Sequence, residues 1–216
     1  MTTRRLAVAT LATGVIAGLV GLACKHILHW VQALAWDMHT GTLLEAASAV
    51  SPTRRILVLT IGGLIGALSW FLLFRRNKAI TSVSAAVGGT PMPPIRATWH
   101  ALTQIILVSL GASVGREVAP REMAAAFAAA AADRLSLTPE DRRIIVACGA
   151  GAGLAAVYSI PLSGAIYTLE ILLVSRSARA VAPAFCTSAI AVLISTGVTR
   201  PAPFYSVPTL TPSLSL

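Results

Sequence analysis

Four charged residues stand between two long apolar runs, in the segment GASVGREVAPREMAAAFAAAA: Arg116, Glu117, Arg121 and Glu122. A charge flanked by apolar helix costs about 2.5–3.5 kcal/mol at the centre of a bilayer, so it persists there only if it is paired or functional. A carboxylate beside a helix N-terminus could occupy an anion site when ionised and leave it when protonated. We therefore expect Glu117 to be a gate and a proton carrier. Arg121 and Glu122, on the next turn, could be its partners, but we expect simple interface charges.

The composition places these residues in a membrane protein. The chain has 216 residues, of which 56% are hydrophobic and 12% charged, and its mean hydropathy is +0.77. An average soluble domain carries about 25% charged residues. Lys and Arg outnumber Asp and Glu by 17 to 8, but the surplus lies at the ends of apolar segments, where basic residues anchor helices to lipid headgroups. Nucleic acid is therefore not an expected partner. We expect an integral protein of a bacterial inner membrane, with a cytoplasmic N-terminus.

Apolar runs follow one another along the whole chain and predict an all-α, polytopic helix bundle. The first run, Leu6 to Cys24, ends in GLAC, which is similar to a lipoprotein cleavage site, but Gly21 stands where a large aliphatic residue is usual and the apolar character continues to Trp36. We expect an uncleaved spanning helix. The further runs are 56–74, 99–114, 123–132, 144–157, 162–174 and 180–198, and most are shorter or interrupted.

Local signals predict some of the helix ends. Thr138, with Pro139 at the first helical position and Asp141 three residues on, predicts a capping box. Ser159 and Pro161 predict the end of one helix and the start of the next.

Three breaks rich in Gly and Pro interrupt the short helices: VGGTPMPPI (87–95), GREVAP (115–120) and YSIPLSG (158–164). At membrane depth, irregular backbone is tolerated only inside protein or beside a water-filled cavity. Each break leaves unpaired N–H groups at the start of the following helix, such as those of Val118 and Ala119, where the macrodipole adds roughly half a positive charge. Converging ends would form an anion site. The alternative, ordinary loops at the membrane surface, stays open on spacing alone.

Small residues predict close packing between helices. The runs MAAAFAAAAA (123–132) and ACGAGAGLAA (147–156) form helix and allow backbones to approach closely, so they should face other helices. Cys24, Cys148 and Cys186 are widely spaced in apolar runs, and we expect them to be small buried hydrophobes with no disulfide framework.

Two of the breaks carry motifs that resemble the CLC family of chloride channels and proton-coupled anion antiporters. Gly115, Arg116, Glu117 and Pro120 are similar to its G-[KR]-E-G-P motif. The segment GAGAGLAAVYSIPLSGAIYTLE (149–170) resembles a longer motif of the family, with matches at Gly149, Gly153, Ala155, Ala156, Tyr158, Pro161, Leu162, Gly164, Tyr167 and Glu170. GTPMP resembles the family's G-S-G-I-P, whose Ser hydroxyl contacts the central anion. The resemblance implies an anion site with Thr90 in that role, at Gly89, Thr90, Pro91, Met92 and Pro93.

The resemblance also implies an architecture. A family subunit has two inverted repeats of broken and tilted helices that share one pathway, and subunits form homodimers. Residues 1–216 resemble the first repeat as a single transmembrane domain, and the second repeat is absent from the sequence. We expect a longer gene product or a second polypeptide to complete the pathway. The remaining alternative is a truncated fragment that does not conduct.

Departures from the family motifs are similar to its fluoride-exporting branch. GREVAP has one residue more than G-R-E-G-P, GTPMP differs from G-S-G-I-P, and Ile171 stands where chloride–proton antiporters carry an internal proton-transfer glutamate. The resemblance therefore implies export of fluoride in exchange for protons, with chloride channel or chloride–proton antiporter activity as the alternative. Selecting fluoride requires close hydrogen-bond donors, because this small ion is strongly hydrated.

Enzymatic readings have little support. GASVG matches the G-x-S-x-G nucleophile elbow with Ser113 as nucleophile, but all four histidines precede Ser113, and a serine hydrolase needs a later His. His26 and His29 could ligate a metal, yet their setting near a helix end at the membrane interface is expected instead. We expect no enzyme activity, no cofactor and no metal.

Overall fold

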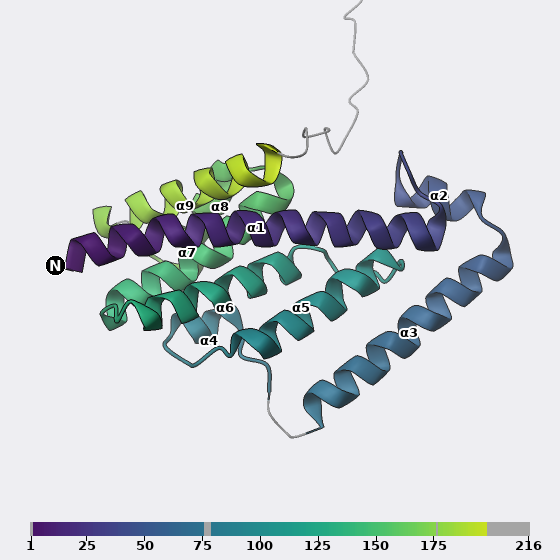
Figure 1. Ribbon diagram of the computed structural model, residues 1–216, viewed down its shortest axis with the longest axis horizontal. Helices are drawn as coiled ribbons and strands as arrows, with labels where there is room; N and C mark the ends of the chain where they lie inside the picture. The colour runs from purple at the N-terminus through teal and green to yellow at the C-terminus, as the bar shows by residue number, and fades with distance from the viewer. Residues whose placement is uncertain (1, 76–78, 176, 198–216) are drawn as a thin grey trace, which may run out of the picture.

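The computed structural model describes residues 2–75, 79–175 and 177–197, and Figure 1 shows a bundle of helices along one long helix. That helix, α1 (Thr2–Trp36), crosses the molecule and packs against α5, α6, α7 and α9. The other elements are α2 (Leu43–Ala49), α3 (Pro52–Phe74), α4 (Val83–Val87), α5 (Pro94–Ser109), α6 (Val118–Arg134), α7 (Pro139–Tyr158), α8 (Pro161–Ile166), the π-helix η1 (Tyr167–Leu173) and α9 (Ala178–Gly197). The predicted all-α bundle is confirmed.

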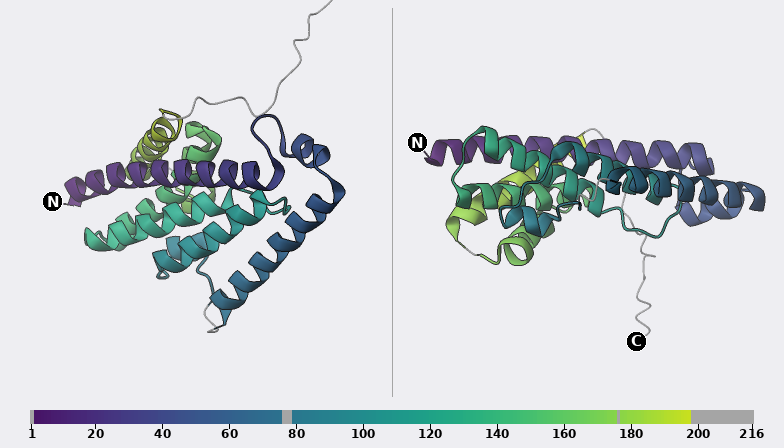
Figure 2. Two further views of the ribbon diagram at one scale, coloured as in Figure 1. Left: turned by 45° about the vertical axis from the view of Figure 1, so that its right-hand side comes forward. Right: turned by 90° about the horizontal axis from the view of Figure 1, so that it is seen from below.

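Three helices in the described part of the chain are long and apolar enough to cross a membrane: α1, α3 and α9. The helices between α3 and α9 are shorter or carry more charge, as the interrupted apolar runs predicted. The helices α5, α6 and α7 each begin five residues before the predicted apolar run, because polar first turns are included. The run 162–174 is divided into α8 and η1, and α4 lies in no predicted run. The shorter helices pack along one side of α1, and the segment of α8 and η1 lies at the edge of the bundle (Figure 2).

Helix starts follow the local chemistry of the sequence. Thr138 caps α7 by accepting a hydrogen bond from the backbone N–H of Asp141, as predicted. The predicted reciprocal bond of a capping box is wrong, because the Asp141 carboxylate accepts two hydrogen bonds from Arg179 of α9 instead. A complete capping box stands at α2, where Thr42 and Glu45 exchange both bonds. Ser159, in the left-handed conformation at φ 58°, ends α7 just before Pro161 opens α8, as predicted.

Small residues bring α6 and α7 into close contact. A Cβ at Gly149 would lie 2.6 Å from Ala128 Cβ and 2.8 Å from the Ala124 carbonyl oxygen, and a Cβ at Gly153 would overlap the Pro120 carbonyl. Nearly every residue of α7 from Ile144 to Val157 is buried. The prediction that these runs face other helices is confirmed. Close packing on α7 thus fixes the position of α6, including its first turn.

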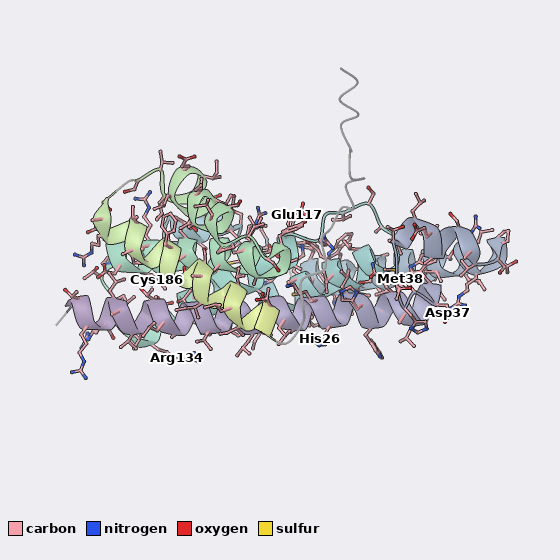
Figure 3. All side chains as sticks on the ribbon, turned by 90° about the horizontal axis from the view of Figure 1, so that it is seen from above. His26, Asp37, Met38, Glu117, Arg134 and Cys186 are labelled. Atoms are coloured by element: carbon pink, nitrogen blue, oxygen red, sulfur yellow. The ribbon has the colours of Figure 1, made fainter. Side chains whose placement is uncertain are left out.

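Outer helices expose apolar surface. The α3 helix packs on α5, with Gly66 against Leu107 and Ser69 hydrogen-bonded to Thr103, and stands to one side of the bundle in Figure 1. Of the cysteines, Cys24 and Cys148 are buried as predicted, but the prediction is wrong for Cys186, which is exposed on α9 (Figure 3). An apolar run does not distinguish a face that packs on protein from one that faces lipid.

Candidate functional site at the start of α6

Glu117 stands at the N-terminus of α6, on the loop that returns from α5. It is the residue before the helix and has αR geometry, and its side chain makes no capping hydrogen bond. The carboxylate instead lies over Gly115, where a Cβ would overlap both of its oxygens. Any larger residue at position 115 would therefore displace the Glu117 carboxylate. Figure 3 shows Glu117 between Arg134, toward one end of the long axis, and Asp37, near the other.

Tyr158, the last residue of α7, holds the two charges of the GREVAP break. Its hydroxyl donates a hydrogen bond to Glu117 Oε2 over 3.3 Å, and the Arg116 guanidinium lies 5.0 Å from the centre of its ring. An O–H···O bond is usually about 2.7–2.8 Å long, so the bond to Glu117 is weak. The structure thus joins two of the three predicted breaks, 115–120 and 158–164.

Two positive side chains lie at the end of α7 that contacts Glu117. Besides Arg116, Lys25 of α1 approaches this end with Nζ 3.4 Å from Ser159 Oγ. Arg121 turns elsewhere and donates a hydrogen bond to the Tyr167 hydroxyl over 3.1 Å, and its Nε is buried without a partner. Positive charge from Arg116 and Lys25 at this end of α7 attracts anions.

The first turn of α6 offers backbone donors. In the described structure, the N–H groups of Val118 and Ala119 have no hydrogen-bond acceptor, and Ala119 is 1% exposed. Pro120, at the third position, has no N–H to donate. Since Glu117 does not cap the helix, these two donors have no capping side chain, and their binding of an anion stays a prediction.

The third predicted element, the loop 89–93, makes its described contacts to residues other than Glu117. Gly89 has a φ of +104°, which favours glycine, and the Thr90 side chain is exposed. Pro91 accepts a hydrogen bond from Thr81, Met92 is buried in the core, and Pro93 caps α5. Within the described residues no hydrogen bond joins this loop to Glu117. The helix α5 that it opens runs antiparallel to α6 (Figure 1), so the loop sits beside a later part of α6.

Other candidates have different settings. His26 and His29 lie within α1, which continues to Trp36, and the described residues contain no cluster of three metal-ligating side chains. Ser113 lies in the irregular loop between α5 and α6. Glu170 is exposed on the π-helix η1. π-Helical turns occur frequently at functional sites, which the sequence did not indicate here.

Arg121 and Glu122, which the sequence predicts as interface charges, contact other helices and not Glu117: Arg121 bonds to Tyr167 of η1 and Glu122 lies against α5. Glu122 is 6% exposed and pairs with His100 of α5, whose Nδ1 lies 2.6 Å from Glu122 Oε2. Sequence reasoning also missed the buried Asp141–Arg179 pair. Glu122 offered a signal, because an acidic residue next to the apolar run 123–132 implies a partner, whereas Asp141 stands in the polar segment TPEDRR and offered none. The sequence does not say which basic residue that partner is.

The comparisons with known proteins settle the family. A sequence profile described as "Voltage gated chloride channel" matches residues 62–216. The chain belongs to the voltage-gated chloride channel family. It is therefore an integral membrane protein of a family that transports anions.

Its similarity to individual family members extends over nearly the whole chain. It is 30% identical over 198 residues to "Voltage-gated ClC-type chloride channel ClcB" of Escherichia coli O81 (strain ED1a), covering 89% of this chain and 47% of that protein. The protein of the same name from Shigella boydii serotype 18 (strain CDC 3083-94 / BS512) is 29% identical over the same shares. The chain thus spans about half the length of the curated relatives it matches.

A solved family structure shares the fold. The crystal structure described as that of a slow cyanobacterial Cl⁻/H⁺ antiporter aligns with a TM-score of 0.73 at 22% identity, over 92% of this chain and 48% of that one. This likeness places the family's helical architecture on the described residues, and the site around Glu117 lies inside it.

Proposed function

We propose that this chain supplies one half of a halide pathway across the inner membrane of a bacterium and that the pathway exchanges the halide for protons. The observation that carries the proposal is the placement of Glu117: a carboxylate at the uncapped N-terminus of α6, held by a weak hydrogen bond from Tyr158, with Arg116 and Lys25 at the same end of α7. The arrangement favours an anion at the start of α6. It also gives the Glu117 side chain two positions, one at the helix N-terminus and one beside Tyr158.

The gate follows from competition for the same donors. Ionised Glu117 can turn toward the N–H groups of Val118 and Ala119 and fill the site itself, because a helix N-terminus stabilises negative charge. Protonated Glu117 gains little there and leaves the donors to a halide. In this scheme, the displaced position of the Glu117 side chain is the one beside Tyr158 and over Gly115. Each exchange of positions therefore accompanies binding or release of a proton.

Two halides have specific support. Chloride appears in the names of the curated relatives and of the structural neighbour. Fluoride is favoured by the departures in GREVAP and GTPMP and by Ile171. In both cases Thr90 would add a hydroxyl donor, as its resemblance to the Ser of the family's G-S-G-I-P motif implies.

The rest of the pathway comes from outside the described residues. We propose that residues 1–216 form the first of two repeats and that the second, from the same gene product or another polypeptide, completes the site in a homodimer. The exposed apolar surfaces of α3 and α9 are available to lipid and to that second half.

The test is halide efflux from liposomes that contain the full-length gene product. Chloride and fluoride electrodes measure release, and a pH electrode measures proton entry in the same vesicles. We expect release of one halide together with proton uptake. Halide release without proton movement would reduce the proposal to a channel, and no release of either ion would refute it.

A further inference from the structure

A second titratable pair is buried between α5 and α6, away from the site around Glu117. His100 Nδ1 lies 2.6 Å from Glu122 Oε2, and the two side chains are 15% and 8% exposed. Glu122 follows Glu117 by five residues on α6. At about 1.5 Å and 100° per residue, it lies about 7.5 Å further along the axis and on another face of the helix. The pair is thus a separate feature of the bundle.

Gln104, one turn after His100 on α5, completes the cluster. Its Nε2 lies 3.3 Å from His100 Nε2, while its Oε1 is buried without a hydrogen-bond partner. In this orientation the amide donates to His100 Nε2, so the imidazole is neutral and its proton sits on Nδ1, where it is donated to the Glu122 carboxylate.

A half-turn of the amide exchanges its nitrogen and oxygen without changing its shape. Gln104 Oε1 would then accept a hydrogen bond from His100 Nε2–H, and the ring would carry protons on both nitrogens. That arrangement leaves an imidazolium beside a carboxylate, and each of its two ring N–H groups faces an acceptor. The cluster can therefore hold one more proton on His100 without losing a hydrogen bond.

Charged side chains on the surrounding helices are engaged elsewhere. On α6 itself, neighbouring Arg121 turns to Tyr167. On α5, Arg96 donates to the Leu73 carbonyl at the end of α3. The α3 basic residues, Arg54 and Arg55, bind backbone carbonyls near the ends of α1 and α2.

On the remaining helices that pack on α5 or α6, the charged side chains with described partners also face away from the cluster. Lys25 of α1 reaches Ser159, and His26 bonds to its own helix. On α7, Asp141 pairs with Arg179 and Arg142 with Asp133. The helix α4 (VSAAV) carries no titratable side chain.

We propose that His100, Glu122 and Gln104 form a proton-binding site in the core of the bundle, distinct from Glu117. Its proton-free form is a neutral imidazole donating to a carboxylate. It binds one proton at His100 Nε2, the Gln104 amide turns over, and the product is an imidazolium–carboxylate pair with both N–H groups donated. The proposal does not depend on which halide is carried or on Glu117 being the gate. It adds a second proton acceptor, His100 on α5, in a chain with Ile171 at the position of the family's internal glutamate.

The test is ¹⁵N NMR of histidine-labelled full-length protein in lipid nanodiscs, from pH 8.5 to pH 5. Substitution of His100→Gln identifies the His100 signal. If the His100→Gln variant does not fold, the triple variant His26→Asn/His29→Asn/His39→Asn identifies the signal instead, because His100 is then the remaining labelled histidine. We expect the neutral form with the proton on Nδ1 at high pH and the imidazolium at low pH. A ring that stays neutral throughout, or one that stays charged throughout, would overturn the proposal.

A pair of carboxylate variants tests the role of Glu122. Glu122→Gln keeps the shape but removes the negative charge, so the ratio of charged to neutral His100 at pH 6 should fall by roughly tenfold or more. Glu140→Gln, at the exposed first turn of α7, is the matched control and should leave the His100 signal unchanged. Equal effects of the two variants would contradict the assigned partner.

Discussion

The Asp141–Arg179 pair makes an asymmetric prediction about stability. Asp141 is 1% exposed at the start of α7, and Arg179 of α9 donates to its two oxygens over 2.8 and 2.9 Å with a side chain that is 44% exposed. Arg179→Met leaves a buried carboxylate without its cation, which costs about 3–5 kcal/mol. The N-terminal dipole of α7 stabilises the unpaired carboxylate by about 0.3–1 kcal/mol. We expect a net loss of about 2–4 kcal/mol.

The opposite substitution should cost less. Asp141→Asn keeps an oxygen that can accept from Arg179, whose half-exposed guanidinium can also be hydrated, so we expect a loss of about 1 kcal/mol. Equilibrium unfolding in mixed detergent micelles, followed by circular dichroism, measures both values. The double variant Asp141→Leu/Arg179→Met removes both charges and should lie near the wild type. A larger loss for Asp141→Asn than for Arg179→Met would refute the reasoning.

Three further predictions concern packing and the site. Gly153→Ala should destabilise the protein by about 1–3 kcal/mol through overlap with Pro120, whereas Gly63→Ala, with open space around it on α3, should stabilise it by up to about 1 kcal/mol. The same unfolding assay measures both variants, and similar effects of the two would contradict the described α6–α7 contact. Gly115→Ala should displace the Glu117 carboxylate and reduce proton-coupled halide exchange by roughly tenfold, and unchanged exchange would mean that the carboxylate does not rest there. Thr90→Ala should weaken halide binding by roughly two- to tenfold, as measured by calorimetry, and an unaltered Kd would remove Thr90 from the site.

The helical class and the position of each break could be predicted because they depend on local properties. Apolar runs give the helices, and residues such as Thr138, Ser159 and Pro161 mark their ends. The placement of Glu117 at a helix start followed from the charge in GREVAP for the same reason.

Pairings across the bundle could not be predicted in this way. The partners of Asp141 and Glu122 stand 38 and 22 residues away, and only the packing of helices decides which basic side chain arrives. The exposure of Cys186 has the same cause, since the face of α9 that meets α1 and α7 is not marked in the apolar run. Arg121 likewise turned out to face Tyr167, on a π-helical turn with no sequence signal.

Proton coupling in the Glu117→Gln variant tests the central claim most directly. The substitution preserves the size of the side chain and removes its titration, so the variant of the full-length protein in liposomes should still release halide while proton uptake falls to background. Glu140→Gln, at the exposed first turn of α7, serves as the reference carboxylate variant. Proton uptake that accompanies halide release in Glu117→Gln at the wild-type ratio would contradict the account.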